Sequence, residues 1–171
     1  FKMVGIPTNT SYKELQLGDL LEVGDMLQSN MKQLKELAER ARGEATIRTS
    51  LEEIRSWFST TNFSWFNHTF AGRTTFIVKE WKQLISDLAD KQSLISSLKD
   101  SPFIKAFQDD ATLWDQKAVA LSTSLRLLNE IQRKWLHLEP VFVKKSLPAH
   151  QEEFEQVDSE FRGIMQKLKD A

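Results

Sequence analysis

Apolar residues recur every three or four positions through the second half of the chain, and this spacing predicts one very long amphipathic helix. No glycine or proline interrupts the sequence from Phe103 to Glu139, about 37 residues. At 1.5 Å per residue such a helix would be roughly 55 Å long. Its apolar positions are Phe107, Ala111, Trp114, Ala118, Leu121, Leu125, Leu128, Ile131, Trp135 and Leu138. Pro140 lacks a backbone donor and disfavours helical geometry before it, so we expect the helix to end there.

The N-terminal third predicts two helices separated at Gly43. Ser11 and Glu14 have the spacing of a capping box, and an apolar stripe follows from Leu17 to Ala41. Gly43 then suits a left-handed helix cap. The second helix covers about residues 44–59, with Ile47, Leu51, Ile54 and Phe58 on one side. A further capping pattern over residues 50–53 leaves open a break in this second helix near Ser50.

Between residues 62 and 78 the period changes from helical to alternating, and β-branched and aromatic residues dominate. This pattern predicts a β-hairpin that turns at residues 71–73. Two strands alone are marginally stable in water, so the hairpin must pack on helices. Phe66, His68 and Phe70 share one face, which we take as a candidate docking surface; packing against the helices is the other interpretation.

Two further helices complete the pattern, one over about residues 79–98 and one that begins at Pro148. Ser101 and Pro102 restart the chain between the third and fourth helices. The short connection after Pro140 implies that the last two helices are antiparallel. The predicted fold is therefore mainly α, an elongated antiparallel helical bundle with one β-hairpin between the second and third helices. We expect its core to include Trp81, Trp114, Leu121, Leu125, Leu128, Trp135, Leu138, Phe154 and Phe161.

Composition narrows the functional classes. A net charge of -1 gives no basic bias, so nucleic acid and anionic membranes are not favoured partners. No stretch approaches the ~18 apolar residues that cross a bilayer, and the first ten residues do not resemble a signal peptide. The absence of cysteine excludes disulfides and thiolate metal sites. We expect residues 1–10 to be a poorly defined extension and residues 11–171 to be a single helical segment.

The sequence contains no recognisable catalytic chemistry. It has no phosphate-binding glycine loop of either common type, so we expect no nucleotide cofactor. His68, His137 and His150 are far apart in sequence and form no metal-binding pair, and we expect no metal. The adjacent acidic pairs, at residues 109–110 and 152–153, face different directions on a helix and are better explained as solvated charges. We therefore expect no catalytic, cofactor-binding or metal-binding residues.

Several short motifs nevertheless occur in an order that a generic bundle would not require. They are Leu51-Glu52-Glu53-Ile54 with Trp57, Gln92-Ser93-Leu94, Ser97 to Pro102, Gln132 to Trp135, Leu138-Glu139-Pro140 with Phe142, Leu147-Pro148, Val157-Asp158, Phe161-Arg162 and Ile164-Met165. Together with the hairpin and the long helix, this order resembles the central part of the dynein heavy-chain linker. Within that family it is most similar to the second cytoplasmic class, the heavy chains of intraflagellar transport.

The resemblance implies a mechanical lever that moves over a ring of ATPase modules and drives microtubule-based transport, in the cytoplasm, on the cytoskeleton and in the cilium or flagellum. It implies that the partners are the ring and the remaining linker, and that this segment is neither an enzyme nor a microtubule-binding element. Bending would concentrate at breaks in the helices, for which Gly43, Pro102 and Pro140 are the candidates. The alternative is a stand-alone helical scaffold or adaptor that binds partner helices.

Overall fold

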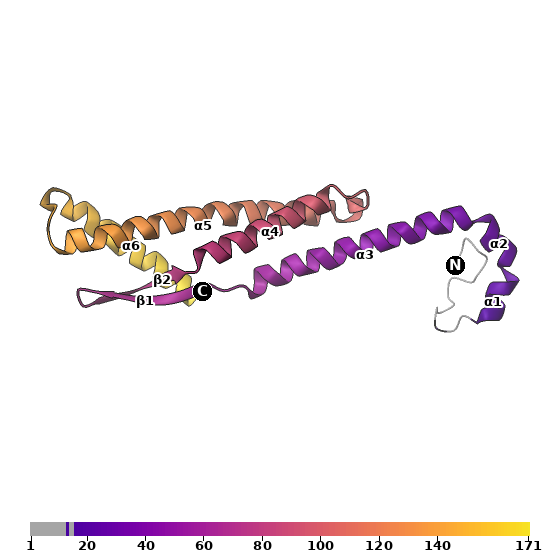
Figure 1. The fold of residues 1–171 in the computed structure, drawn as a ribbon, viewed down its shortest axis with the longest axis horizontal. Coiled ribbons are helices and arrows are strands. Elements are labelled where there is room, and N and C mark those ends of the chain that lie inside the picture. The colour runs from indigo at the N-terminus through magenta and orange to yellow at the C-terminus, as the bar shows by residue number, and fades with distance from the viewer. Residues whose placement is uncertain (1–12, 14–15) are drawn as a thin grey trace.

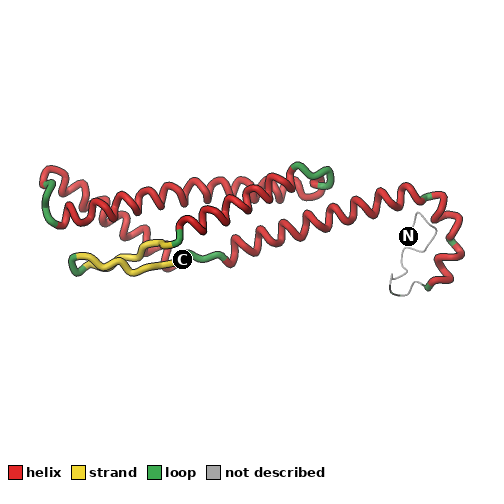
Figure 2. Tube along the Cα trace, in the orientation of Figure 1, coloured by secondary structure: helices red, strands yellow, loops and turns green. Residues whose placement is uncertain are grey.

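The computed structural model describes Lys13 and residues 16–171, and these form a long, narrow molecule (Figure 1). The α-helices are α1 (Leu17–Glu22), α2 (Gly24–Ser29), α3 (Met31–Thr60), α4 (Trp81–Lys99), α5 (Gln108–Val143) and α6 (Gln151–Asp170). The strands are β1 (Ser64–Phe70) and β2 (Arg73–Lys79), and short 3₁₀ turns, η2 (Ile104–Phe107) and η3 (Pro148–His150), precede α5 and α6. The predicted class, a helical bundle with a single hairpin, is confirmed (Figure 2).

Two separate cores form along α5. The first, here the helical core, joins α3, α4, η2 and the N-terminal half of α5, and its buried residues are all apolar. The second, here the hairpin core, joins the hairpin, the C-terminal half of α5 and α6. The side chains of Phe63 and Trp81 pack against both. One helix of 36 residues therefore carries two differently built ends of the molecule.

The predicted helix end at Gly43 is wrong, because α3 continues through it. The predicted helix start at Ser11 lies outside the described residues, and the chain is instead broken at Val23 and Asn30, between α1, α2 and α3. The reason for a glycine at 43 is close packing. A Cβ atom there would lie 2.1 Å from Cδ2 of Phe103, so only glycine lets the Phe103 ring approach the helix. No break occurs near Ser50 either.

The predicted end of the long helix at Pro140 is also wrong, because α5 continues to Val143. A proline costs a helix one hydrogen bond and a clash with the preceding turn. Here that cost falls within the last turn, and the residues beside it are held from outside the helix. Glu139 is buried against α6 and the hairpin, and the Phe142 ring stacks on Phe154 at 4.3 Å. At the other end, α5 begins at Gln108 rather than Phe103, after the η2 turn.

The buried face of α5 departs from the predicted apolar stripe in its second half. Ile131 and Leu138 are 40% and 39% exposed, whereas the neighbouring Gln132 and Glu139 are buried. The expected core position of Leu138 is therefore wrong. Five of the seven buried residues of α5 form a series with a spacing of seven: Ala111, Ala118, Leu125, Gln132 and Glu139. The hydrophobic pattern does not mark Gln132 and Glu139 as buried, because both are polar. Their burial depends on hydrogen-bonding partners that the sequence does not reveal.

The same shift occurs in α6, where Val157 and Ile164 are each 50% exposed and Asp158 and Met165 are buried.

From Val143 the chain turns through η3 and runs back along the molecule as α6, as the short connection predicted (Figure 1). The N-terminal half of α3 has no buried side chain before Ile47 and extends beyond the two cores (Figure 1). None of the described helices has the length and hydropathy needed to cross a membrane.

Candidate functional site

A cluster of charged side chains, here the polar cluster, ties the hairpin, α5 and α6 together inside the hairpin core. Arg162 of α6 lies at its centre. Its Nη2 donates to Oε1 of Glu139 at 2.5 Å, and its Nε donates to Oδ1 of Asp158 at 2.8 Å. The side chains of both carboxylates are about 5% exposed or less. Buried ions of this kind persist only with well-placed partners, so the three groups depend on one another.

The hairpin supplies two further members of the polar cluster. Nε2 of His68 lies 2.6 Å from Oε2 of Glu139, and Nη1 of Arg73 lies 2.8 Å from Oδ2 of Asp158. Each buried carboxylate therefore bridges Arg162 to one residue of the hairpin. His68 stands on β1, and Arg73 begins β2 just after the turn. The turn itself places Ala71 and Gly72 at positive φ, which suits a tight hairpin of the type that matches strand twist.

Trp135 of α5 forms the apolar wall of the polar cluster. Its indole Nε1 donates to Oδ1 of Asp158 at 3.0 Å, and its ring stacks on Phe161 with centroids 4.6 Å apart. The His68 ring meets it edge-on at 5.7 Å, and the Arg162 guanidinium lies 5.0 Å from its centroid. The ring shields the two ion pairs of Arg162 from water, which strengthens them electrostatically.

Gln132 joins α5 to the outer edge of β2. Its side-chain Nε2 donates to the carbonyl oxygen of Val78 at 2.8 Å, and its Oε1 accepts from the Val78 amide at 2.9 Å. The amide side chain thus takes the place of a third strand at this point, and it satisfies two backbone groups that would otherwise be buried without partners. The hairpin is therefore attached to the helices both through the backbone of the β2 edge and through its side chains.

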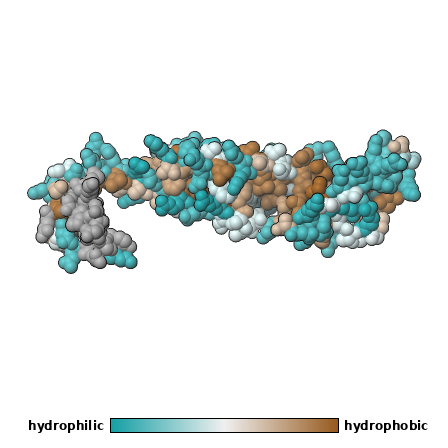
Figure 3. Space-filling model, turned by 180° about the vertical axis from the view of Figure 1, so that it is seen from behind, coloured by the Kyte–Doolittle hydropathy of each residue, from teal (hydrophilic) through white to brown (hydrophobic). Residues whose placement is uncertain are grey.

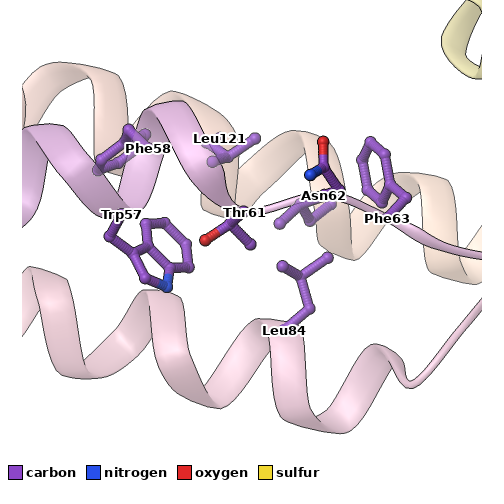
Figure 4. A pocket seen from close by; sticks show the side chains of 8 residues that line it. Trp57, Phe58, Thr61, Asn62, Phe63, Leu84 and Leu121 are labelled. Carbon is purple, nitrogen blue, oxygen red and sulfur yellow. The ribbon is translucent and has the colours of Figure 1, made fainter.

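A small pocket lies where the helical core meets the hairpin, at the end of α3 (Figure 4). Its volume is about 190 Å³, and its lining residues are Trp57, Phe58, Thr61, Asn62, Phe63, Leu84, Leu121 and Leu125. The wall is apolar except for Thr61 and Asn62, and no histidine or acidic side chain lines it that could act as an acid or base or activate the Thr61 hydroxyl. Among the described residues there is also no group of histidine and acidic side chains that could hold a metal ion.

The predicted site residues are distributed between these features. Leu125, Trp135, Phe154 and Phe161 are buried, and Trp81, Trp114, Leu121 and Leu128 are partly buried. The candidate docking surface does not form one free face. His68 is turned into the polar cluster, Phe70 is partly buried beside it, and only Phe66 is exposed, with the Lys79 ammonium 3.8 Å from its ring centroid.

Sequence reasoning missed the functions of Gln132, Glu139, Asp158 and Arg162, although the motifs that carry the family resemblance contain all four. The available signal was that Gln132 and Glu139 follow Leu125 at intervals of seven, in register with the buried series. Polar residues at such positions are buried when a partner satisfies them.

The exposed side of α5 carries a separate ion pair. Nζ of Lys134 lies 2.6 Å from Oε1 of Glu130 on the preceding turn. The hydrogen bond and the charge of Lys134 hold the pKa of Glu130 below its ordinary value. Both groups are largely in solvent, so this pair contributes little to folding.

Comparison with known proteins relates these features to a family. A family model described as "Dynein heavy chain, N-terminal region 2" matches residues 1–171. The chain is 40% identical to cytoplasmic dynein 2 heavy chain 1 of Rattus norvegicus over 170 residues, which covers 99% of the chain. It is 39% identical to the protein of that name from Caenorhabditis elegans over 173 residues, covering 100% of the chain. In Chlamydomonas reinhardtii the identity is 38% over 167 residues, covering 95% of the chain. The chain spans about 4% of the length of these relatives.

Proposed function

The chain belongs to the dynein heavy-chain family, as part of its N-terminal region, and on this premise we propose that it is a mechanical segment of the linker. In this role it transmits movement between the ATPase ring and the rest of the arm. Its partners are then the ring and the remaining linker, and the segment itself performs no catalysis and does not touch the microtubule. The relatives named cytoplasmic dynein 2 support retrograde intraflagellar transport in the cilium as the process.

The continuity of α5 is the observation that carries this proposal. A lever must resist bending over tens of ångströms, and α5 extends through both cores for 36 residues, roughly 54 Å, without a break. Close-packed side chains on each half couple the helix to its neighbours. Force applied to the hairpin core is thereby transmitted to the helical core through an uninterrupted backbone.

The polar cluster supports the same role at one end of the segment. It links three elements through buried ion pairs and hydrogen bonds with defined directions, so the hairpin has one preferred position on α5 and α6. We propose that bending occurs at the candidate positions rather than in the middle of α5. Of these, Pro102 lies in the connection between α4 and η2, whereas Gly43 and Pro140 lie within α3 and α5.

The proposal is tested by breaking α5 between its two cores in the complete heavy chain. Two glycines inserted after Arg126, between Leu125 of the helical core and Leu128 of the hairpin core, weaken the helix and turn the second half relative to the first. We expect microtubule gliding by the motor to slow several-fold while its ATPase activity persists, because only transmission is lost. A conservative change of an exposed residue nearby, Ser124→Ala, serves as the control. Unchanged gliding velocity after the insertion would show that this segment is not the lever.

A further inference from the structure

Six exposed side chains without charge line four turns of α5 outside the helical core. This outer face consists of Leu113, Gln116, Val119, Ala120, Thr123 and Leu127, and all six side chains are exposed. Leu113, Ala120 and Leu127 each follow a buried core residue by two positions, which is about 200° around the helix. These three residues therefore lie opposite the core, and Val119 and the exposed Lys117 flank them, each about 100° from the core. The outer face extends for roughly 21 Å along the axis.

The outer face differs from the exposed surface at the start of α3, which is charged. Charged residues make up 27% of the chain, and the exposed surface of α3 before Ile47 includes Lys35, Glu36, Glu39 and Arg40. Figure 3 shows that hydrophobic surface is most concentrated in the middle of the molecule's length. Ala120 and Thr123 are small, and small residues allow another helix to approach closely. Exposed apolar side chains interspersed with small residues are typical of a helix surface that packs against another helix.

Positive charge borders one end of the outer face. A groove beside α5 is lined by Arg126, Asn129, Glu130, Arg133, Lys134 and His137. Glu130 is already paired with Lys134, whereas Arg126 and Arg133 form no ion pair with any residue that the structure describes. Two exposed guanidinium groups therefore remain available where the uncharged face ends.

From this arrangement we infer that α5 docks an amphipathic helix with carboxylates at one end. Its apolar stripe covers the outer face, and its carboxylates pair with Arg126 and Arg133. An uncharged face alone would accept a helix in either direction. The guanidinium groups at one end fix the direction and reject a helix that is basic there. This inference uses the surface of α5 only and does not depend on the lever function.

The test uses the 171-residue chain and two synthetic helical peptides with identical stripes of leucine and alanine. One peptide carries three glutamates at one end, and the other carries three lysines at the same positions. Binding is measured by fluorescence anisotropy against four proteins: the unchanged chain, Ala120→Arg, the double variant Arg126→Glu/Arg133→Glu, and a matched control, Lys35→Glu/Arg42→Glu. The control makes the same change in net charge on exposed residues of α3. Circular dichroism checks that each variant remains folded.

We expect the glutamate peptide to bind the unchanged chain at least about tenfold more tightly than the lysine peptide. Ala120→Arg should weaken both peptides about tenfold or more, the double variant should reverse their order, and the control should leave it unchanged. Equal affinities for the two peptides, an equal effect of the control, or no binding up to about millimolar peptide would overturn the inference. A chain that self-associates, and that Ala120→Arg renders monomeric, would also overturn it by identifying a second copy as the occupant.

Discussion

The two cores share α5 but differ in the polarity of the α5 residues that they bury. At the buried positions spaced by seven, the helical core has Ala111, Ala118 and Leu125, whereas the hairpin core has Gln132 and Glu139. The neighbours explain the change. Helices α3 and α4 satisfy their own backbone groups and need only apolar contact, but β2 presents an unpaired edge, and the hairpin brings His68 and Arg73 inward.

The apolar core and the core with the polar cluster should differ in how they respond to substitution. An apolar core accepts modest repacking as long as volume is conserved. A buried ionic cluster adds little net stability, but it is strongly destabilised when one member is removed. We therefore expect the hairpin core to tolerate substitution less well than the helical core.

The largest effect is expected from Trp135→Ala, which removes a buried ring and the indole donor to Asp158. The free energy of unfolding should fall by about 3–5 kcal/mol, measured by urea denaturation. Trp114→Ala is the matched change in the helical core, where the ring is only partly buried and packs on Phe58. We expect a smaller loss there. A loss under about 1 kcal/mol for Trp135→Ala would place that ring outside the core.

Next in size is Arg162→Met, which leaves Glu139 and Asp158 buried without their shared cation. Loss of one partner from a buried ion pair costs about 3–5 kcal/mol, and the same denaturation measurement applies. Arg55→Met removes the exposed ion pair with Asp110 and should cost less than about 1 kcal/mol. Equal losses for the two arginine variants would mean that the polar cluster is not a buried network.

Gln132→Leu tests the attachment of the β2 edge. The side chain keeps its approximate size but leaves the Val78 amide and carbonyl without partners, at a cost of about 1–3 kcal/mol. Hydrogen exchange at the Val78 amide should accelerate as well. Gln116→Leu, on the exposed side of the same helix, should change neither quantity. Unaltered exchange at Val78 in the Gln132 variant would argue against this attachment.

Gly43→Ala probes the close approach of Phe103 to α3. An added methyl group would overlap the ring, so we expect a loss of about 1–3 kcal/mol despite the better helix propensity of alanine. Gly163→Ala in α6 has open space and should instead stabilise by about 0.5–1 kcal/mol. If both alanines stabilise equally, the contact between Gly43 and Phe103 is not restrictive.

The smallest effect concerns Glu130, outside both cores. Because Lys134 lowers the pKa of Glu130, Lys134→Ala should raise that pKa towards its ordinary value, as an NMR titration of the side-chain carboxyl would show. The small contribution of this pair to stability is fully present above the pKa of the free carboxyl and is lost as the pH falls through the lowered pKa. An unchanged titration curve would exclude Lys134 as the cause.

Much of the architecture could be predicted from periodicity and turn chemistry. The long helix, the hairpin with its turn near Gly72, and the family resemblance are confirmed. These features depend on local patterns that each segment carries in its own residues. The continuation of α3 through Gly43 and of α5 through Pro140 could not be predicted. The Phe103 ring that packs on Gly43, and the residues His68 and Arg162 that hold Glu139, come from distant parts of the chain.

The polar cluster was missed for a related reason. Hydrophobic spacing selects Leu138 and Val157 for burial, yet the buried neighbours are Glu139 and Asp158. Their burial depends on Arg162, His68 and Arg73, which converge from three elements. The burial of a charged residue can be predicted only when its partners are known, and the tertiary structure determines which residues those partners are.

The most direct test of the central claim, that α5 joins the two cores into one stiff body, is a distance distribution measured between them. The chain has no cysteine, so spin labels can be introduced at Glu52→Cys on α3 and Gln156→Cys on α6, both exposed, and read by pulsed electron paramagnetic resonance. We predict a single narrow distribution that broadens when two glycines are inserted after Arg126, between the two cores. A broad or two-peaked distribution in the protein without the insertion would contradict the account.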